Sequence, residues 1–459
     1  MINSVPRLMI AGVSSGGGKT TVTCGLLTAL VARGLKTASF KCGPDYIDPM
    51  FHSEIIGAKS RNLDLFLSDE NTVRYLLQKN AAGCDIAVME GVMGYYDGIA
   101  GRSTDASSYA VAKATGTPVI LVLDCKGMSV SAAAVAKGFL SLRNSGIKGL
   151  ILNRVPGSLY AELKSMIENE LDVPVLGFLP NMPESVLKSR HLGLVTAAEV
   201  QDLKNKLNRI AAQMEESVDI GRLLHIAREA PGISCNAPLL PRLDKRVTVA
   251  VARDSAFCFY YQDNIDLLSE MGARIVEFSP IHDDKIPEEA DGLLLGGGYP
   301  ELYAGDLASN QSMLLSVKER IADGLPAVAE CGGFMYLHRT MEDERGIKHE
   351  MAGVIEADCY RTSRLNRFGY LSLTAKHDTM LLKKGGSING HEFHYWDSTV
   401  PGEAYETKQP LREGILSCAY GTTSLYAGFP HLYFYGNIGA AFAFLNQCAR
   451  YAPKRGQDA

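Results

Sequence analysis

Two glycine-rich segments of the 459-residue chain contain side chains that could do chemistry, and the first of them carries Lys19. Its sequence is "AGVSSGGGKTT", with Thr20 directly after the lysine. Glycines let backbone N–H groups surround phosphate oxygens, a lysine here reaches the β and γ phosphates, and the next hydroxyl ligates Mg²⁺. Five residues separate Gly12 from Gly18, one more than in the usual P-loop. The strand-like run before the loop and the helical run after it still favour a nucleotide site over an ordinary glycine-rich turn.

Four acidic residues end or closely follow apolar runs that predict strands: Asp45, Asp48, Glu90 and Asp97. The carboxyl ends of parallel strands form the edge of a sheet where ligands bind, and Mg²⁺ bound to a triphosphate needs carboxylate oxygens there. Any one of these acids alone is better explained as the cap of a turn or helix. Four of them beside one phosphate loop favour, for the group, a part in the nucleotide site.

The second segment whose side chains could do chemistry is "PAVAECGGFMYL", in which an apolar strand runs into Cys331 and then into a helical pattern. A cysteine at such a sharp turn lies at a helix start, where the dipole lowers its pKa and nearby N–H groups can stabilise an oxyanion. The base that it needs is His431, His391 or His394, and the sequence alone does not choose among them. The position two residues after His431, where an orienting acid is expected, is Tyr433.

The elements that must position these residues form two α/β blocks. Short apolar runs alternating with helical patterns predict a mostly parallel sheet buried on both faces in each block, and the tyrosine- and glycine-rich final third adds antiparallel strands. Strands of the first block are expected at Arg7–Val13, Thr37–Lys41, Ile86–Glu90, Val119–Asp124, Gly149–Asn153 and Val175–Phe178, and those of the second at Val247–Ala252, Ala273–Phe278, Gly292–Leu295 and Ala327–Ala329. We expect a first domain at 1–196, a helical segment and linker at 197–245, and a second domain at 246–459.

Composition excludes several classes of protein. The 46 Lys and Arg against 51 Asp and Glu give a net charge of −5, which does not favour binding to nucleic acid or to an anionic membrane. No run approaches the roughly 18 apolar residues of a membrane span. The ten cysteines include no C-x-x-C pair, which is typical of a reduced, cytoplasmic protein.

The order and spacing of the motifs resemble the cobyrinic acid a,c-diamide synthase family. The resemblance runs nearly end to end, through "AGVSSGGGKTT", "FKCGPDYIDP", "EGVMGYYDG", "ILNRV", "SRHLGL", "VAVARDSAFCFYY", "GGGYPE", "AECGGFMYL" and "GHEFHY". It implies a dethiobiotin-synthetase-like P-loop domain with a parallel sheet, fused to a class I glutamine amidotransferase α/β domain. The activity implied is amidation of the a and c side-chain carboxylates of cobyrinic acid, a step of cobalamin biosynthesis. ATP and Mg²⁺ would activate the carboxylate as an acyl phosphate, and glutamine hydrolysis at Cys331 would supply ammonia.

The resemblance also implies roles for individual residues. The phosphates and the nucleotide would be held by Ser15, Gly16, Gly17, Gly18, Lys19, Thr20, Thr21 and Asn153. The Mg²⁺ ligands would be Thr20, Glu90 and Asp45, and the residues near the macrocycle Tyr46, Ile47, Asp48, Asp97 and Arg190, although "SRHLGL" is equally well explained as a solvated turn. The glutaminase centre would consist of Cys331 and His431, with an oxyanion hole formed by Gly297, Gly298 and Gly332.

Two alternatives stay open at this point. One keeps the reaction and changes the ring, since hydrogenobyrinate or nickel sirohydrochlorin presents similar carboxylates. The more distant one is a P-loop switch ATPase, whose nucleotide controls dimerisation, but a switch has no use for a glutaminase centre. The partners expected are therefore small molecules, and a homodimer is compatible with the sequence.

Overall fold

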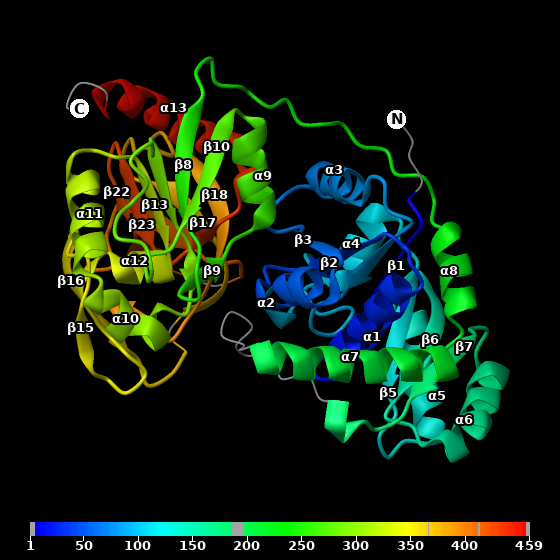
Figure 1. Cartoon of the computed structure of the whole chain (residues 1–459). Coiled ribbons are helices and arrows are strands. Elements are labelled where there is room, and N and C mark those ends of the chain that lie inside the picture. Colours follow the sequence, from blue (N-terminus) through cyan, green and yellow to red (C-terminus); the bar gives the residue numbers. More distant parts are fainter. Residues whose placement is uncertain (1–4, 186, 188–196, 366, 412–413, 456–459) are drawn as a thin grey trace. The chain divides into compact units, whose positions relative to one another are not determined.

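The computed structural model describes residues 5–185, 187, 197–365, 367–411 and 414–455 (Figure 1). The chain forms two compact units, 1–237 and 238–459, which divide inside the proline-rich stretch 231–246. None of the helices in the described ranges combines the length and the apolar character that a bilayer crossing requires.

Unit 1 is built on a parallel sheet that, in the described residues, has seven strands. In sheet order they are β3 (Lys59–Leu63), β2 (Thr37–Cys42), β4 (Ile86–Glu90), β1 (Arg7–Gly12), β5 (Val119–Asp124), β6 (Ile147–Asn153) and β7 (Val175–Leu179). The helices are α1 (Lys19–Ala32), α2 (Ile47–Met50), α3 (Glu70–Ala81), α4 (Ser108–Thr115), α5 (Val130–Ser141), α6 (Gly157–Glu170), α7 (Ala197–Ser217) and α8 (Ile220–Arg228), with a π-helical turn at Phe51–Ile56. The near-continuous apolar strands are buried on both faces, as parallel strands require.

The six strands predicted in this block are confirmed to within two residues, and the strand that the sequence analysis missed is β3. β3 has the polar sequence "KSRNL", so it gives no apolar run. It is an edge strand that pairs with β2, and its Asn62 donates hydrogen bonds to the carbonyl oxygens of Gly43 (2.9 Å) and Asp45 (2.7 Å). The Asn62 amide is thereby satisfied by the neighbouring loop, which favours a polar residue at this position of the strand.

Helix α7 packs on α1 in the core of unit 1, although the sequence analysis set 197–245 apart as a separate segment. Buried side chains of both helices, including Leu26 of α1 and Ile210 of α7, belong to one apolar cluster. Gly25 permits the close approach, because a Cβ at this position would lie 2.5 Å from Cγ2 of Ile210. Helices α7 and α8 therefore complete the apolar layer over one face of the parallel sheet.

Unit 2 contains a mixed main sheet, a fully antiparallel second sheet and a mixed third sheet. The antiparallel strands expected in the final third are thereby confirmed. The main sheet has the order β10 (Ala273–Phe278), β8 (Val247–Ala252), β11 (Gly292–Leu295), β13 (Ala327–Glu330), β23 (Leu425–Gly428) and β22 (Tyr420–Gly421), with β22 antiparallel. A second sheet has the order β21 (Leu416–Cys418), β20 (Tyr405–Lys408), β17 (Arg367–Ala375), β18 (Ser387–His394) and β24 (His431–Leu432).

The smaller sheets and the helices of unit 2 surround this framework. A third sheet has the order β15 (Lys348–Glu350), β14 (His338–Glu342), β16 (Ile355–Arg361) and β19 (Trp396–Ser398), and β12 (Gly297–Gly298) pairs with β9 (Phe257–Phe259). The helices are α9 (Gln262–Glu270), α10 (Ala304–Ser309), α11 (Gln311–Ala322), α12 (Gly332–Tyr336) and α13 (Ile438–Arg455). Chain positions about 100 residues apart meet where the ends of β13 and β23 lie side by side.

Candidate active sites

The phosphate loop of unit 1 connects β1 to α1. Gly18 caps the helix in a left-handed conformation, φ 98°, which favours glycine. The Lys19 side chain is buried and its Nζ donates to the carbonyl oxygen of Ser14 at 2.8 Å. Burial, together with the nearby positive charge of Lys41, lowers the pKa of Lys19 to about 8. The lysine is thus held at the loop, where an incoming phosphate would replace a carbonyl as its partner.

Asn153, at the end of β6, supports this loop directly. Its Nδ2 donates to the carbonyl oxygen of Gly17 at 3.1 Å, and the side chain is buried. A Cβ on Gly18 would lie 2.0 Å from the same Nδ2, so only glycine fits between Asn153 and the loop. The role of Asn153 in holding the nucleotide stays a prediction.

Glu90, at the end of β4, is the centre of a buried polar network. Its Oε1 accepts a hydrogen bond from the Thr20 hydroxyl at 2.6 Å and lies 2.8 Å from Nζ of Lys41, which also pairs with Asp48. Its Oε2 lies 3.4 Å from Nε2 of the fully buried His52. Burial opposes the charged form of each group, but the attraction of Lys41 and His52 lowers the pKa of Glu90, and the two acids raise the pKa of Lys41.

The donor set at this edge of the sheet fits Mg²⁺. The Thr20 hydroxyl and the Glu90 carboxylate are hard oxygen ligands only 2.6 Å apart, and Mg²⁺ on a nucleotide takes few protein ligands because phosphates and water supply the rest. Asp45 uses Oδ1 to accept the N–H groups of Ile47 (2.8 Å) and Asp48 (3.2 Å) at the start of α2, which leaves its Oδ2 as the atom for the predicted metal role.

The residues predicted to lie near the macrocycle differ in burial and in their contacts. Tyr46 and Ile47 are half-buried at the start of α2, whereas Asp48 is buried against Lys41. Asp97 accepts the N–H of Gly94 at 3.0 Å, so it caps its own turn, and its negative charge raises the pKa of Lys19, against the larger effect of burial. Arg190 lies outside the described residues.

Cys331 occupies the sharp strand-to-helix turn between β13 and α12 that the sequence predicted. Its backbone has φ 47° and ψ −101°, a conformation that is strained for any residue except glycine, and its N–H donates to the carbonyl oxygen of Gly428 at 2.8 Å. Strain of this kind is found where a fold must present one side chain in one direction.

His431 is the histidine that meets Cys331. Burial alone would lower the pKa of His431, but hydrogen bonds with Cys331 and Glu330 outweigh it and raise this pKa above the ordinary value. His394 instead donates from Nδ1 to the carbonyl oxygen of Trp396 at 2.6 Å and stacks on Phe429. The geometry therefore favours His431 over His394 as the base.

The predicted oxyanion glycines gather around the same centre. A Cβ on Gly332 would lie 3.3 Å from the backbone nitrogen of Gly298, and one on Gly297 would lie 2.5 Å from Cε1 of His431. These glycines keep open the space beside Cys331 into which a substrate carbonyl must fit.

Comparison with known proteins agrees with a nucleotide-binding unit followed by an amidotransferase unit. Residues 8–194 match the CobQ/CobB/MinD/ParA nucleotide binding domain, and residues 248–437 match the CobB/CobQ-like glutamine amidotransferase domain. Proteins named cobyrinate a,c-diamide synthase are 37% identical in Caldanaerobacter subterraneus, 39% in Thermoplasma volcanium and 41% in Listeria monocytogenes. These alignments cover 97%, 98% and 94% of this chain and 99%, 99% and 97% of the relatives. The chain belongs to the cobyrinate a,c-diamide synthase family.

Three residues near the two centres of this cobyrinate a,c-diamide synthase family member were missed by the sequence analysis. Lys41 is a charge inside the apolar strand β2, which was a usable signal, and Glu330 directly precedes the nucleophile. His52 gives no signal, because the π-helical turn that directs it to Glu90 is not encoded in any simple periodicity.

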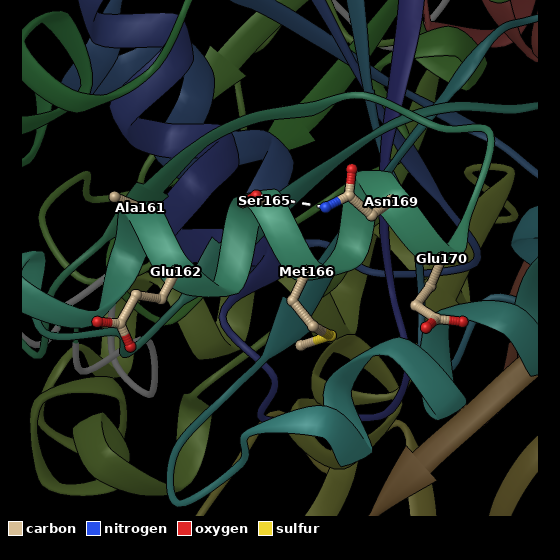
Figure 2. Close-up of a pocket in the computed structure, with 6 residues that line it drawn as sticks. All are labelled: Ala161, Glu162, Ser165, Met166, Asn169 and Glu170. Carbon is tan, nitrogen blue, oxygen red and sulfur yellow. Dashed lines mark hydrogen bonds between the residues drawn. The ribbon is translucent and has the colours of Figure 1, made fainter.

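A separate hollow along α6 carries none of this chemistry. It has a volume of about 600 Å³ and is lined by Ala161, Glu162, Ser165, Met166, Asn169 and Glu170, all on one helix (Figure 2). Asn169 and Ser165 bond to each other at 3.5 Å. The hollow contains no residue of either centre, so we assign it no role in the reaction of this family.

Proposed function

We propose that this protein uses ATP and glutamine to convert the a and c carboxylates of cobyrinic acid into amides. The observation that carries the proposal is the presence, in one chain of this family, of the Lys19–Thr20–Glu90 phosphate centre and the Cys331–His431 centre. A carboxylate does not react with ammonia at neutral pH, because its oxygen is a poor leaving group. One centre improves the leaving group and the other produces the nucleophile.

In unit 1 the reacting carboxylate oxygen attacks the γ phosphorus of ATP, the bond to ADP breaks, and an acyl phosphate forms. Lys19 and the N–H groups of the loop stabilise the charge on the phosphoryl oxygens. Bound Mg²⁺, held by Thr20 and Glu90, would neutralise further phosphate charge. Lys41 holds both buried acids in place and lowers the pKa of Glu90, whereas burial and the charge of Glu90 raise the pKa of Asp48 to about 7.

In unit 2 the Cys331 thiolate attacks the side-chain amide carbon of glutamine. His431 protonates the departing nitrogen, so ammonia leaves and a thioester forms. Water then hydrolyses the thioester with His431 as base, which releases glutamate. The ammonia attacks the acyl phosphate and displaces inorganic phosphate, so each amide formed consumes one ATP and one glutamine.

The test is mass spectrometry of the macrocycle after incubation with the purified protein, MgATP and glutamine. Cobyrinic acid should undergo two carboxyl-to-amide conversions, and parallel reactions with hydrogenobyrinate and nickel sirohydrochlorin decide which ring is preferred. ATP consumption without amidation of any of the three rings would contradict the proposal. We also infer a cytoplasmic location, which the sequence supports because its ten cysteines include no C-x-x-C pair. A homodimer remains a prediction.

A further inference from the structure

The position two residues after His431, where an acid that orients this base is expected, is occupied by a tyrosine. Tyr433, two residues after His431, is buried and directs its hydroxyl to Oδ2 of Asp263 at 3.4 Å, with its ring edge against Tyr261. A phenol held in this way supplies no carboxylate to the imidazole. A buried imidazole that must carry a proton needs a fixed negative partner.

Glu330 lies at the position that such a partner requires. It is the last residue of β13, and it lies opposite Gly428, the last residue of the neighbouring strand β23. His431 follows Gly428 by three residues. Its Oε2 lies 3.4 Å from Nδ1 of His431, and its Oε1 accepts the backbone N–H of Leu432 at 3.1 Å. The two oxygens of one carboxylate therefore fix both the ring and the backbone that carries it.

The ring orientation agrees with this assignment. Nδ1 of His431 faces Glu330, whereas Cε1 and Nε2 lie toward Gly297, whose Cβ would be 2.5 Å from Cε1 and 3.2 Å from Nε2. Nε2 is thus left for Cys331 and for the departing nitrogen of glutamine. This arrangement is the one that a nucleophile, a base and an orienting acid require.

We propose that Glu330, the residue immediately before the nucleophile, is the positioning residue that orients His431 and stabilises its imidazolium form during glutamine hydrolysis. The proposal rests on the proposed function of unit 2. Glu330 takes up no proton in this scheme, because the proton moves between Cys331, Nε2 of His431 and the leaving ammonia. The glutaminase centre thereby has a nucleophile, a base and an orienting acid, although the residue two positions after His431 is Tyr433.

Other titratable groups also surround His431 and must be separated from Glu330 in any test. Cys331 and Glu330 face it from the β13–α12 turn, and His391, Glu392 and His394 act on it from β18. Glu392 is the rival carboxylate, but its Oε2 lies 4.0 Å from Nε2 of His394, and burial raises the pKa of Glu392 to about 7, which makes it a weaker source of fixed negative charge. Its substitution therefore provides the matched comparison.

The experiment measures glutamine hydrolysis by the full chain for Glu330→Gln, Glu330→Asp and Glu392→Gln, with the exposed Glu350→Gln as control. Glu330→Gln should lower kcat about 100-fold or more with little change in KM for glutamine, and should shift the alkaline limb of the pH profile to lower pH, because His431 loses its negative partner. Glu330→Asp should recover part of kcat. Ammonium-supported amidation should remain at the wild-type rate in all variants.

Three outcomes would overturn the proposal: a kcat for Glu330→Gln within about twofold of wild type, a loss of kcat with no pH shift and no recovery in Glu330→Asp, or a larger loss in Glu392→Gln than in Glu330→Gln. Absence of glutamine hydrolysis in the wild-type protein would instead contradict the proposed function. The two failures are therefore distinguishable.

Discussion

Nζ of Lys41 lies 2.8 Å from Oε1 of Glu90, and both side chains are almost completely shielded from water. The same carboxylate oxygen accepts the Thr20 hydroxyl, so the buried ion pair is joined directly to the phosphate loop. Taking two charges out of water is costly, and such a pair is stable only when each partner is present. The arrangement presents a fixed, ionised carboxylate to the nucleotide centre.

Replacing Lys41 with Met should destabilise unit 1 by about 3–5 kcal/mol, because Glu90 and Asp48 would remain buried without their counter-charge. Loss of Lys41 raises the folded-state pKa of these acids, so the destabilisation should grow as the pH rises from 5 to 8. Urea unfolding at several pH values measures it. The exposed Lys137→Met serves as the control, and a loss below about 1 kcal/mol at pH 8 would contradict the prediction.

The sequence revealed those features that depend on neighbouring residues in the chain. The Gly18–Lys19–Thr20 loop and the Cys331 turn each lie within a few residues, and the apolar strands that lead into them are continuous. The contact between Glu330 and His431 joins residues about 100 positions apart through the pairing of β13 with β23, which no local pattern encodes. Likewise, β3 escaped detection because tertiary hydrogen bonds, rather than apolar side chains, stabilise it.

Replacing Lys19 with Ala should abolish amidation with either nitrogen source. Lys19 is the charged residue of the "SSGGGKTT" loop, and loss of one such stabilising group costs about 100-fold or more in rate. Amide formation from cobyrinic acid is measured with glutamine and, separately, with high ammonium. Lys137→Ala is the control, and substantial ammonium-dependent activity in Lys19→Ala would remove the phosphate loop from the mechanism.

Replacing Cys331 with Ala should separate the two centres. Amidation with glutamine should fall by about 1,000-fold or more, because no other group takes over the attack on the amide. Activity with high ammonium should remain near the wild-type rate, since unit 1 is unchanged. The half-buried Cys84→Ala provides a matched cysteine control. Full glutaminase activity in Cys331→Ala would show that the nucleophile lies elsewhere.

Gly297→Ala tests the space beside the base. The added methyl would lie 2.5 Å from Cε1 of His431, which is closer than atoms can approach, so the ring must move. A displacement of about 1 Å in a catalytic group can cost about 100-fold in rate, and the loss should appear in glutamine hydrolysis and spare ammonium-supported amidation. Gly138→Ala, in α5, meets no atom within 4 Å and should leave both activities unchanged. Equal glutaminase rates in the two variants would place His431 away from Gly297.

His338 should make unit 2 sensitive to acid. The ring is fully buried between the carbonyl oxygen of Phe334 (2.8 Å) and Oγ of Ser398 (2.7 Å), and burial lowers the pKa of His338 to about 4. An unfolded chain binds a proton at this histidine below about pH 6.5, whereas the folded chain does not until about pH 4. The free energy of unfolding should therefore fall as the pH drops through this window, by up to about 3 kcal/mol from His338 alone.

His338→Gln removes this titration while keeping hydrogen-bonding groups in the same place. Compared with wild type, its free energy of unfolding in urea should depend less steeply on pH between 6.5 and 4, although the stability at pH 7 falls. The exposed His282→Gln should retain the wild-type slope. His391 and His394 also have lowered pKa values because of burial, so part of the slope should remain. An unchanged slope in His338→Gln would mean that this ring accepts a proton without unfolding, and that the buried contacts to Phe334 and Ser398 do not hold it neutral.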